Sequence, residues 1–286
     1  MSHQRNGRIA VVTDSTASLP NELVERHGVH VVPLHVIIDG VSAKEGVEVL
    51  PIQVARAFGE RRGRVTTSRP TPGEFSEVYA ELLREADGVV SVHVSGKLSG
   101  TVEAAQLAAE GFADRVTVID SCSTGMGLGF PALAAAEAAA SGADLAEARR
   151  AVEEAVARTS VLFYVDTLEF LRRGGRIGAG EALLGTALAV KPILHVADGE
   201  VLVKEKVRTA GRALARIEDL SLSAAGAGPV DIAVHHLDSA RRAADVIDHL
   251  SSKLPELREA HTSEVSAAVG AHVGPGLVGV VVHRRA

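Results

Sequence analysis

The chain has 286 residues, a hydrophobic content of 46% and a formal net charge of −6, which together fit two domains or one large α/β domain with a full core. With 2 Tyr, 6 Phe, no Trp and no block of basic residues, it lacks a base-stacking platform and a groove for a phosphate backbone, so nucleic acid is not expected as a partner. The single cysteine, Cys122, excludes an internal disulfide and is typical of the reducing cytoplasm; it is expected to be a small buried residue or a reactive thiol.

The chain begins with a polar segment. Residues 1–7 lack the apolar stretch of a signal peptide, so export is not expected. The alanine-rich residues 132–140 are interrupted by Glu137 and are too short to span a bilayer. A cytoplasmic protein without a membrane span is therefore predicted.

Apolar runs of strand length alternate with helical patterns along the first half of the chain. We expect strands at residues 9–12, 88–94 and 116–119, and helices at residues 20–27, 72–86, 102–109 and 131–140. This alternation favours a mostly parallel sheet with crossover helices, in which ligands bind at the carboxyl ends of the strands. Two strands lead into an acid and a hydroxyl, Asp14 with Ser15 and Asp120 with Ser121, which either support a site or only cap helices and tie loops together.

A hydroxyl-rich segment precedes the best marked helix of the chain. Thr71 is a predicted N-cap, and Glu74 stands where a capping box places its carboxylate. We expect a loop here that holds Thr67 and Ser68 at the helix entrance, a setting in which small anions bind.

A second hydroxyl-rich turn, residues 95–101, lies between a predicted strand and the next helix. Ser99, followed by Gly100, would lie beside free N–H groups at the helix N-terminus, which suits a carboxylate or a phosphate. The alternative is that Ser99 only caps its helix.

The pattern changes at about Thr159, which predicts an N-terminal α/β lobe at residues 1–159 and a C-terminal α+β lobe at residues 160–286. The second part holds a predicted hairpin whose strands are joined through Asp198 and Gly199, a turn pair that hairpins favour. Its other predicted elements are strands at residues 160–165, 230–234 and 277–282 and helices at residues 209–220 and 239–250.

Two glycine-rich turns in the second part carry residues that could reach an anion. Arg176 follows a Gly-Gly pair, and an arginine there can hold a carboxylate with two donors. His272 lies in a glycine turn ahead of the last predicted strand, where it serves either a ligand or the fold alone.

Other chemistries find little support in the sequence. The segment around Lys97 lacks the first glycine of a phosphate-binding loop, and the glycines at 127 and 129 lie several residues beyond the strand that a dinucleotide fingerprint requires. Because neither a His-Glu-x-x-His motif nor a cysteine cluster occurs, no metal and no cofactor are expected. The strongest enzyme alternative is a serine hydrolase acting on an acyl ester, with Ser99 as nucleophile, His272 as base and Asp14 or Asp120 as its partner, although no Gly-x-Ser-x-Gly elbow surrounds Ser99.

Seven short segments, taken together and in order, resemble the DegV family of bacterial proteins. They are DST at 14–16, TSRPTPGEF at 67–75, LSGT at 98–101, DS at 120–121, LEFLRRGGR at 168–176, KPIL at 191–194 and AHVGPG at 271–276. The resemblance implies a two-lobed fatty-acid-binding protein without catalysis of its own, which buries a long acyl chain and holds its carboxylate between the lobes. It further implies that the bound fatty acid is presented to a separate fatty acid kinase, which forms an acyl phosphate for phospholipid synthesis.

By motif position, the resemblance assigns the fatty-acid carboxylate to a small set of residues. The contacts would be Thr67 and Ser99, with Arg176 and His272 close by, Ser68 and Gly100 as neighbours, and Asp14, Ser15, Asp120 and Ser121 behind them. The sequence departs from the family at residues 42–46, where an aromatic and an aspartate are usual, and at Arg69, where glutamine is common. Five basic residues either dock the kinase or form an ordinary solvated face: Arg172, Arg173, Lys204, Lys206 and Arg208.

Overall fold

Four parallel strands form the first sheet, in the order β2-β1-β6-β7. The computed structural model describes residues 8–59, 64–178 and 190–286. The strands are β1 Ile9–Asp14, β2 Val29–Val32, β6 Gly88–His93 and β7 Val116–Asp120. Three of them were expected from the apolar runs, and their parallel pairing confirms the α/β class predicted for this part of the chain.

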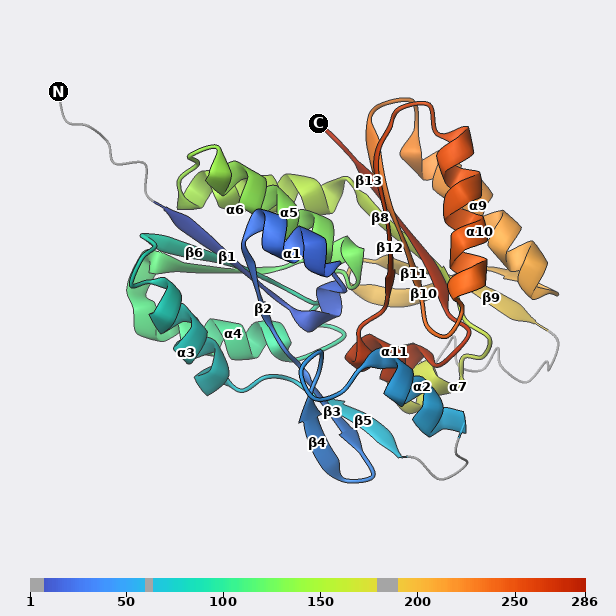
Figure 1. Ribbon diagram of the computed structural model, residues 1–286, viewed down its shortest axis with the longest axis horizontal. Coiled ribbons are helices and arrows are strands. Elements are labelled where there is room, and N and C mark those ends of the chain that lie inside the picture. Colours follow the sequence, from blue (N-terminus) through green and yellow to red (C-terminus); the bar gives the residue numbers. More distant parts are fainter. Residues whose placement is uncertain (1–7, 60–63, 179–189) are drawn as a thin grey trace.

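Helices cover both faces of the first sheet (Figure 1). One face carries α1 Asn21–His27, α5 Met126–Ala140 and α6 Leu145–Ala157; the other carries α3 Pro72–Leu82 and α4 Thr101–Ala109. Short 3-10 turns follow β1 at Ser15–Ala17 and α4 at Glu110–Arg115. The capping box of α3 is present as predicted, since the Thr71 hydroxyl and the Glu74 carboxylate each bond the other residue's backbone N–H.

The second sheet is mixed and has six strands in the order β10-β9-β8-β13-β11-β12. Only β11 and β12 run parallel; the other neighbours are antiparallel. The strands are β8 Thr159–Tyr164, β9 Lys191–Ala197, β10 Glu200–Val207, β11 Val230–His236, β12 Leu257–Glu264 and β13 Val278–Arg284. The predicted hairpin is confirmed as β9 and β10. Because β8 begins at Thr159, we propose this point as the boundary between lobes 1–159 and 160–286.

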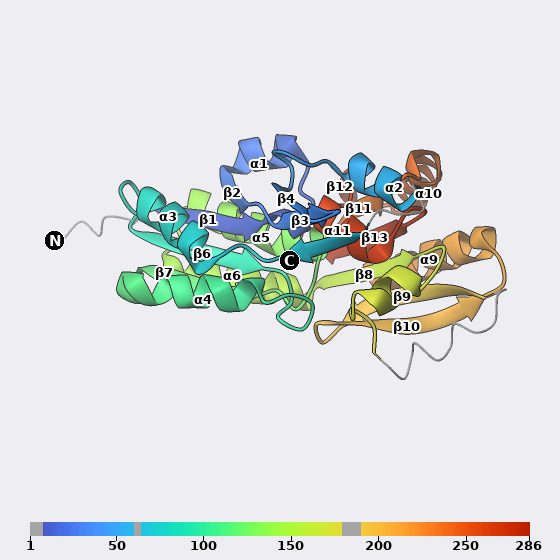
Figure 2. The ribbon, with the colours of Figure 1, turned by 90° about the horizontal axis from the view of Figure 1, so that it is seen from below.

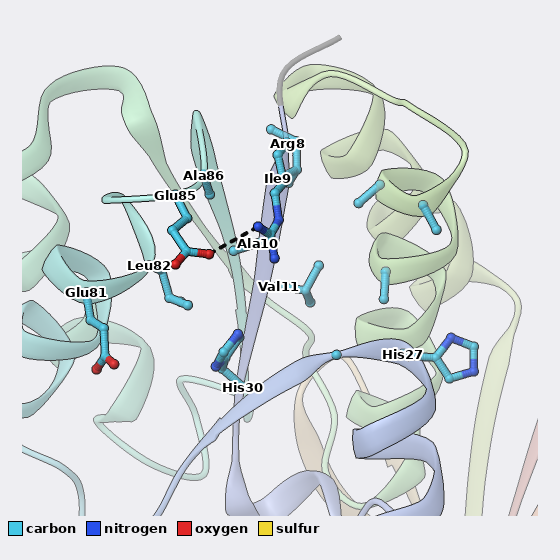
Figure 3. Close-up of a pocket in the computed structure, with 14 residues that line it drawn as sticks. Arg8, Ile9, Ala10, Val11, His27, His30, Glu81, Leu82, Glu85 and Ala86 are labelled. Atoms are coloured by element: carbon cyan, nitrogen blue, oxygen red, sulfur yellow. Dashed lines mark hydrogen bonds and ion pairs between the residues drawn. The ribbon is translucent and has the colours of Figure 1, made fainter.

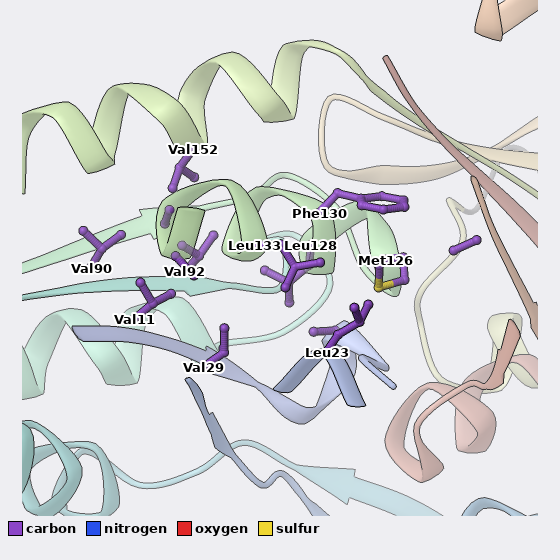
Figure 4. Packing of buried hydrophobic residues seen from close by; sticks show 14 of the residues in the cluster. Val11, Leu23, Val29, Val90, Val92, Met126, Leu128, Phe130, Leu133 and Val152 are labelled. Atoms are coloured by element: carbon purple, nitrogen blue, oxygen red, sulfur yellow. The ribbon is translucent and has the colours of Figure 1, made fainter. Parts of the chain in front are cut away.

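The two sheets lie side by side along the long axis of the molecule (Figures 1 and 2). Helices α9 Ala210–Ala225 and α10 Ala240–Lys253 pack on one face of the second sheet, with the core of that lobe between them and the strands. Figure 4 shows part of the core around α5, including Met126, Leu128 and Phe130. The same cluster includes Ala233 and Val281 from the second sheet, so α5 contributes to both halves. None of the described helices is long and apolar enough to cross a bilayer.

Helix α5 begins five residues before the predicted start, and its glycines explain the difference. A Cβ on Gly127 would lie 2.1 Å from Ser123 Oγ and 2.5 Å from Val161 Cγ2. The glycine therefore allows the first turn of α5 to approach β8 closely, a packing role rather than that of a dinucleotide-binding loop.

A third sheet, which the sequence did not predict, has the antiparallel order β4-β3-β5. Its strands are β3 His35–Ile38, β4 Val41–Lys44 and β5 Val65–Ser68, and α2 Pro51–Gly59 lies between β4 and β5 in the chain. The expectation of a hydroxyl-rich loop at Thr67 was wrong, because this segment is strand β5. Two short helices of the second half complete the structure, α7 Glu169–Arg173 and α11 Ala267–Val273, and α11 packs on β3, β5 and α2.

Candidate functional site

Four of the predicted site residues line a single pocket at the junction of the three sheets. Thr67 comes from β5, Ser99 from the loop before α4, Arg176 from the turn after α7, and His272 from α11. The pocket has a volume of about 80 Å³. Side chains separated by up to 205 positions in the sequence therefore meet at one place.

Thr67 and His272 contact each other directly. The Thr67 hydroxyl lies 2.9 Å from Nε2 of His272. Burial, and next to it the positive charge of Arg176, lowers the pKa of His272 to about 4. The imidazole is therefore neutral at pH 7. One ring nitrogen can accept a hydrogen bond from a hydroxyl, and the other, which carries the proton, can donate one to a hydroxyl or to an anion.

The ring of His272 fits against a glycine. A Cβ at Gly174 would lie 2.3 Å from Nδ1 of His272, although Gly174 itself has an ordinary backbone conformation, with φ −74°. The position thus requires a small residue because of close approach, and the Gly-Gly pair of the sequence leaves room for the histidine.

Arg176 supplies positive charge at the polar end of the pocket. Its Nε donates to the Leu98 carbonyl at 3.0 Å and its Nη1 donates to the Gly174 carbonyl. The side chain is half-buried, and burial lowers the pKa of the guanidinium. Among the described residues no carboxylate pairs with Arg176, so the pocket holds a partly desolvated cation for which none of these residues provides a counter-charge.

Ser99 is free of the capping role that the sequence left open. The N-cap of α4 is Gly100, which has no side-chain cap bond, and the Ser99 hydroxyl instead lies 2.9 Å from Oγ1 of Thr101. Either hydroxyl can donate in this pair. Ser99 can therefore turn its proton toward a ligand while it keeps Thr101 as a partner.

Two predicted neighbours of the site do not line the pocket. Ser68 is exposed and its hydroxyl bonds the backbone of Arg69, while the Gly100 carbonyl accepts from the Arg69 guanidinium at 3.3 Å. Arg69 also pairs with Glu103 at 2.8 Å, so its charge is turned away from the pocket. This arrangement limits the effect of arginine at a position where the family commonly has glutamine.

Asp14 lies behind the pocket wall and holds two of its residues in place. Its buried carboxylate accepts from the backbone N–H groups of Thr16 and Val94, each at 3.0 Å, and from the Thr16 hydroxyl. Nδ1 of His93 lies 3.0 Å away as a further partner. Since Thr16 and Val94 both line the pocket, Asp14 supports its shape without reaching a ligand itself.

Asp120 and Ser121 order a neighbouring loop. Asp120 accepts from the backbone N–H groups of Gly96, at 3.0 Å, and Cys122, at 2.7 Å, and Ser121 bonds Ser123. The expectation of a buried Cys122 was wrong, because the residue is exposed in a left-handed turn with φ 49°. Partial desolvation of the thiol and the nearby Asp120 carboxylate raise the pKa of Cys122, which opposes the reactive-thiol alternative.

Apolar side chains form most of the remaining pocket wall, and the sequence did not single them out. Two of them lie on strands of the second sheet, others lie on α7 and α11, and the rest lie in the connections from β2 to β3 and from β6 to α4; the pocket also contacts the hydroxyl residue Thr124. The apolar members are Leu34, Val94, Leu98, Phe163, Leu171, Val201, Ala268, Val269 and Val273. Ordinary core residues look the same in a sequence, so no local signal could have identified them.

The residues proposed for a serine hydrolase are not arranged as a catalytic triad in the described part of the chain. Ser99 bonds Thr101 and not a histidine, His272 bonds Thr67, and the two aspartates hold backbone N–H groups elsewhere. A triad requires a nucleophile bonded to a base that is oriented by an acid. The geometry therefore favours binding over nucleophilic catalysis.

A larger cavity, about 420 Å³, lies at the amino ends of β1 and β2, away from this site. Figure 3 shows its charged rim, where Arg8 and Glu85 form an ion pair at 3.2 Å while 72% and 78% of their side chains remain exposed. Exposed ion pairs of this kind contribute little to stability. The Arg8 guanidinium at this cavity already has a carboxylate partner, unlike Arg176 in the other pocket. No group of three or more potential metal ligands occurs among residues 8–59, 64–178 and 190–286.

The fold and the pocket define a two-lobed α/β binding protein whose apolar pocket ends in hydroxyls, a histidine and an arginine. The family model described as "Uncharacterised protein, DegV family" matches residues 8–285. The chain belongs to the DegV family.

Relatives and solved structures agree with this assignment. A DegV domain-containing protein of Streptomyces coelicolor is 51% identical over 97% of this chain and 99% of its own length. A structure of a DegV family protein from Thermus thermophilus, described by its fatty acid binding, is 37% identical, covers 97% of this chain and 100% of its own, and has a TM-score of 0.92. The structure of DegV from Bacillus subtilis, described as a fatty acid binding protein, is 34% identical. It covers 98% of this chain and 100% of its own, and has a TM-score of 0.89.

Proposed function

We propose that this protein binds a long-chain fatty acid, with the carboxylate at Thr67, Ser99, Arg176 and His272 and the acyl chain among the apolar side chains. The observation that carries the proposal is Arg176, a half-buried guanidinium in an apolar pocket without a carboxylate partner among the described residues. Hydroxyls and a neutral histidine beside it supply hydrogen-bond donors for an anion. The fatty acid binding described for the Thermus and Bacillus proteins supports the same ligand class here.

Burial of the acyl chain can supply the affinity. Roughly fourteen methylenes at about 0.8 kcal/mol each are worth on the order of 11 kcal/mol, against an association cost of about 4 to 15 kcal/mol. The polar contacts must therefore at least offset the desolvation of the carboxylate. Arg176 is suited to this role because it is already partly desolvated.

The pocket must enlarge to receive such a chain. Its volume of about 80 Å³ is well below the roughly 300–1,000 Å³ of typical ligand sites. The apolar wall includes Leu98, Phe163 and Val201, which belong to a cluster that adjoins the pocket. We infer that the acyl chain enters by displacing side chains of this cluster.

A second part of the proposal concerns the fate of the ligand. Because the described residues form no catalytic triad, we propose that the protein presents the fatty acid to a separate kinase, which forms an acyl phosphate for phospholipid synthesis. Lys204 and Lys206 project from β10, an edge strand of the second sheet, and both are exposed, as are Arg172, Arg173 and Arg208. Such a basic face suits a partner with an acidic surface. If charge reversal at Lys204 and Lys206 leaves transfer to the kinase unchanged, this surface is not the docking site.

Mass spectrometry of the purified protein, native and after solvent extraction, tests the ligand. We expect a stoichiometric fatty acid in the wild type, and a lower occupancy in Thr67→Ala and Ser99→Ala. Thr66→Ala is the matched control, because Thr66 lies on the same strand but is exposed and does not line the pocket. Normal occupancy in both site variants would refute the site, and a wild type that neither carries nor takes up fatty acid would refute the ligand.

A further inference from the structure

A buried glutamate that the proposed ligand does not touch connects the walls of the pocket. Glu45 follows β4 and is 4% exposed. Its backbone N–H donates to the Leu34 carbonyl at 2.9 Å, and the turn closes through a bond of 2.9 Å from Gly46 N to the Val49 carbonyl. The backbone of this turn therefore fixes the place from which the side chain extends.

The two carboxylate oxygens of Glu45 accept from opposite halves of the chain. Oε2 accepts from the Ser15 hydroxyl at 2.8 Å, in the turn after β1. Oε1 accepts from the backbone N–H of Ala268 at 3.1 Å, in the first turn of α11 and 223 positions further along the chain. One side chain thus spans the end of the first sheet and the start of a C-terminal helix.

Two of the groups that hold the Glu45 carboxylate adjoin the pocket. Ala268 lines it directly, and Ser15 precedes Thr16, which also lines it. The Ser15 hydroxyl in turn accepts from the backbone N–H of Leu34 at 2.9 Å, and Leu34 is a further wall residue. A displacement of the Glu45 carboxylate would therefore act on three parts of the wall at once.

Helix α11 connects the Glu45 carboxylate to His272, because it contains both Ala268 and His272. His272 lies four residues after Ala268, which corresponds to about one helical turn. At its other end the short helix meets β5 through the bond between His272 and Thr67. The position of the imidazole therefore depends on how the first turn of α11 is held.

Burial of the Glu45 carboxylate carries a desolvation cost. No lysine, arginine or histidine pairs with it among the described residues, and burial raises the pKa of the carboxyl. Hydrogen bonds from Ser15, Ala268 and Ser266 act in the opposite direction and favour the charged form. The charged form is thus stabilised by donors from both halves of the chain.

We infer that Glu45 is a positioning residue for the fatty-acid site, which holds α11 against the end of β1 so that His272 meets Thr67. The inference rests on the proposed function, in which those two residues receive the ligand carboxylate. Glu45 itself makes no contact with the ligand in this arrangement.

The test compares Glu45→Gln and Glu45→Ala with Glu48→Gln. Glu48 is a matched control because it lies in the same turn and accepts from Lys44 N at 2.7 Å, yet it is exposed and does not line the pocket. Delipidated protein is titrated with oleate by calorimetry, and the His272 ring is titrated by NMR in the ligand-free state. We expect oleate affinity to fall about tenfold in Glu45→Ala and less in Glu45→Gln, whose amide keeps one acceptor.

The NMR readout separates positioning from general stability and from the ligand hypothesis. In Glu45→Ala and Glu45→Gln the pKa of His272 should rise from about 4 toward its ordinary value, whereas Glu48→Gln should match the wild type. A wild-type His272 titration together with wild-type oleate affinity in Glu45→Gln would overturn the inference, even if Glu45→Ala fails to fold. If the wild type binds no oleate but the His272 titration still shifts, Glu45 positions the helix and only the proposed ligand is wrong.

Discussion

Acid should weaken the contact between the two halves of the molecule through His235, a buried histidine of β11. Its Nε2 accepts from the backbone N–H of Met126, the first residue of α5, at 2.9 Å. The ring proton is therefore assigned to Nδ1, which donates to the Ser263 hydroxyl at 3.1 Å, and that hydroxyl donates to the Ser18 carbonyl at 3.0 Å. Protonation of Nε2 would remove the acceptor for Met126.

The size of the effect follows from the pKa. Burial lowers the pKa of His235 to about 4, against about 6.5 in the unfolded chain. A native pKa below the unfolded value means that the stabilisation is complete above pH 6.5 and is lost as the pH falls toward 4. At pH 5 this loss is about 2 kcal/mol for one histidine.

Urea unfolding at pH 7.5 and pH 5.0, followed by circular dichroism, measures this loss. The glutamine in His235→Gln does not titrate, and its amide oxygen can accept from the Met126 N–H. Between pH 7.5 and pH 5.0, the free energy of unfolding of this variant should therefore fall by about 2 kcal/mol less than that of the wild type. His249→Gln is the control, because the His249 side chain is 63% exposed and should behave as the wild type. An equal pH dependence in His235→Gln and the wild type would refute the reasoning.

Three further predictions follow from individual contacts. Gly174→Ala should displace the His272 ring and weaken oleate binding about tenfold by calorimetry, whereas Gly178→Ala, whose added Cβ meets nothing within 4 Å, should bind normally. Asp14→Asn should lower the free energy of unfolding by about 3 kcal/mol in urea, because an amide group would face backbone donors. Cys122 should react with iodoacetamide at pH 7.5 more slowly than a small free thiol, because its pKa is raised.

Contrary results would identify the faulty step in each case. Wild-type oleate affinity in Gly174→Ala would show that the pocket accommodates a displaced His272. An unchanged unfolding midpoint in Asp14→Asn would mean that the network behind the pocket is dispensable. Alkylation of Cys122 at the rate of a free thiol would show that its pKa is ordinary.

Local signals predicted the elements whose stabilising contacts lie close together in the sequence. The capping box of α3 joins Thr71 and Glu74, three residues apart, and the turn at Asp198 and Gly199 joins adjacent strands. Such features depend on backbone conformation over a few residues, so they are visible in the sequence.

The third sheet escaped prediction although β3 and β4 are joined by the two-residue turn Asp39–Gly40, a hairpin signal of the same kind as Asp198–Gly199. Its strands have only four residues each, and β5 pairs with β3 through a long connection. Strand β5 has the sequence Val-Thr-Thr-Ser, with three consecutive hydroxyl residues, and resembles a loop by composition. Its pairing with β3 and its cover by α11 decide its conformation, and no local pattern records either contact.

The same error explains why part of the predicted site was misplaced. Motif positions brought Thr67, Ser99, Arg176 and His272 to one pocket, but Ser68 points away. Successive side chains of a strand face opposite sides, so a strand at this position cannot direct Thr67 and Ser68 to the same ligand.

The connection of β3 and β5 to α11 has a consequence for synthesis on the ribosome. Val36 of β3 and Val54 of α2 are buried partly by Ala267, Ala268 and Ala271, which are translated more than 200 residues later. The last strand, β13, enters the second sheet between β8 and β11 and not at its edge. Contacts of such separation form slowly, and their apolar surfaces remain exposed meanwhile. We therefore expect the nascent chain to depend on chaperones until its final residues emerge, with the ligand pocket as the last region to close.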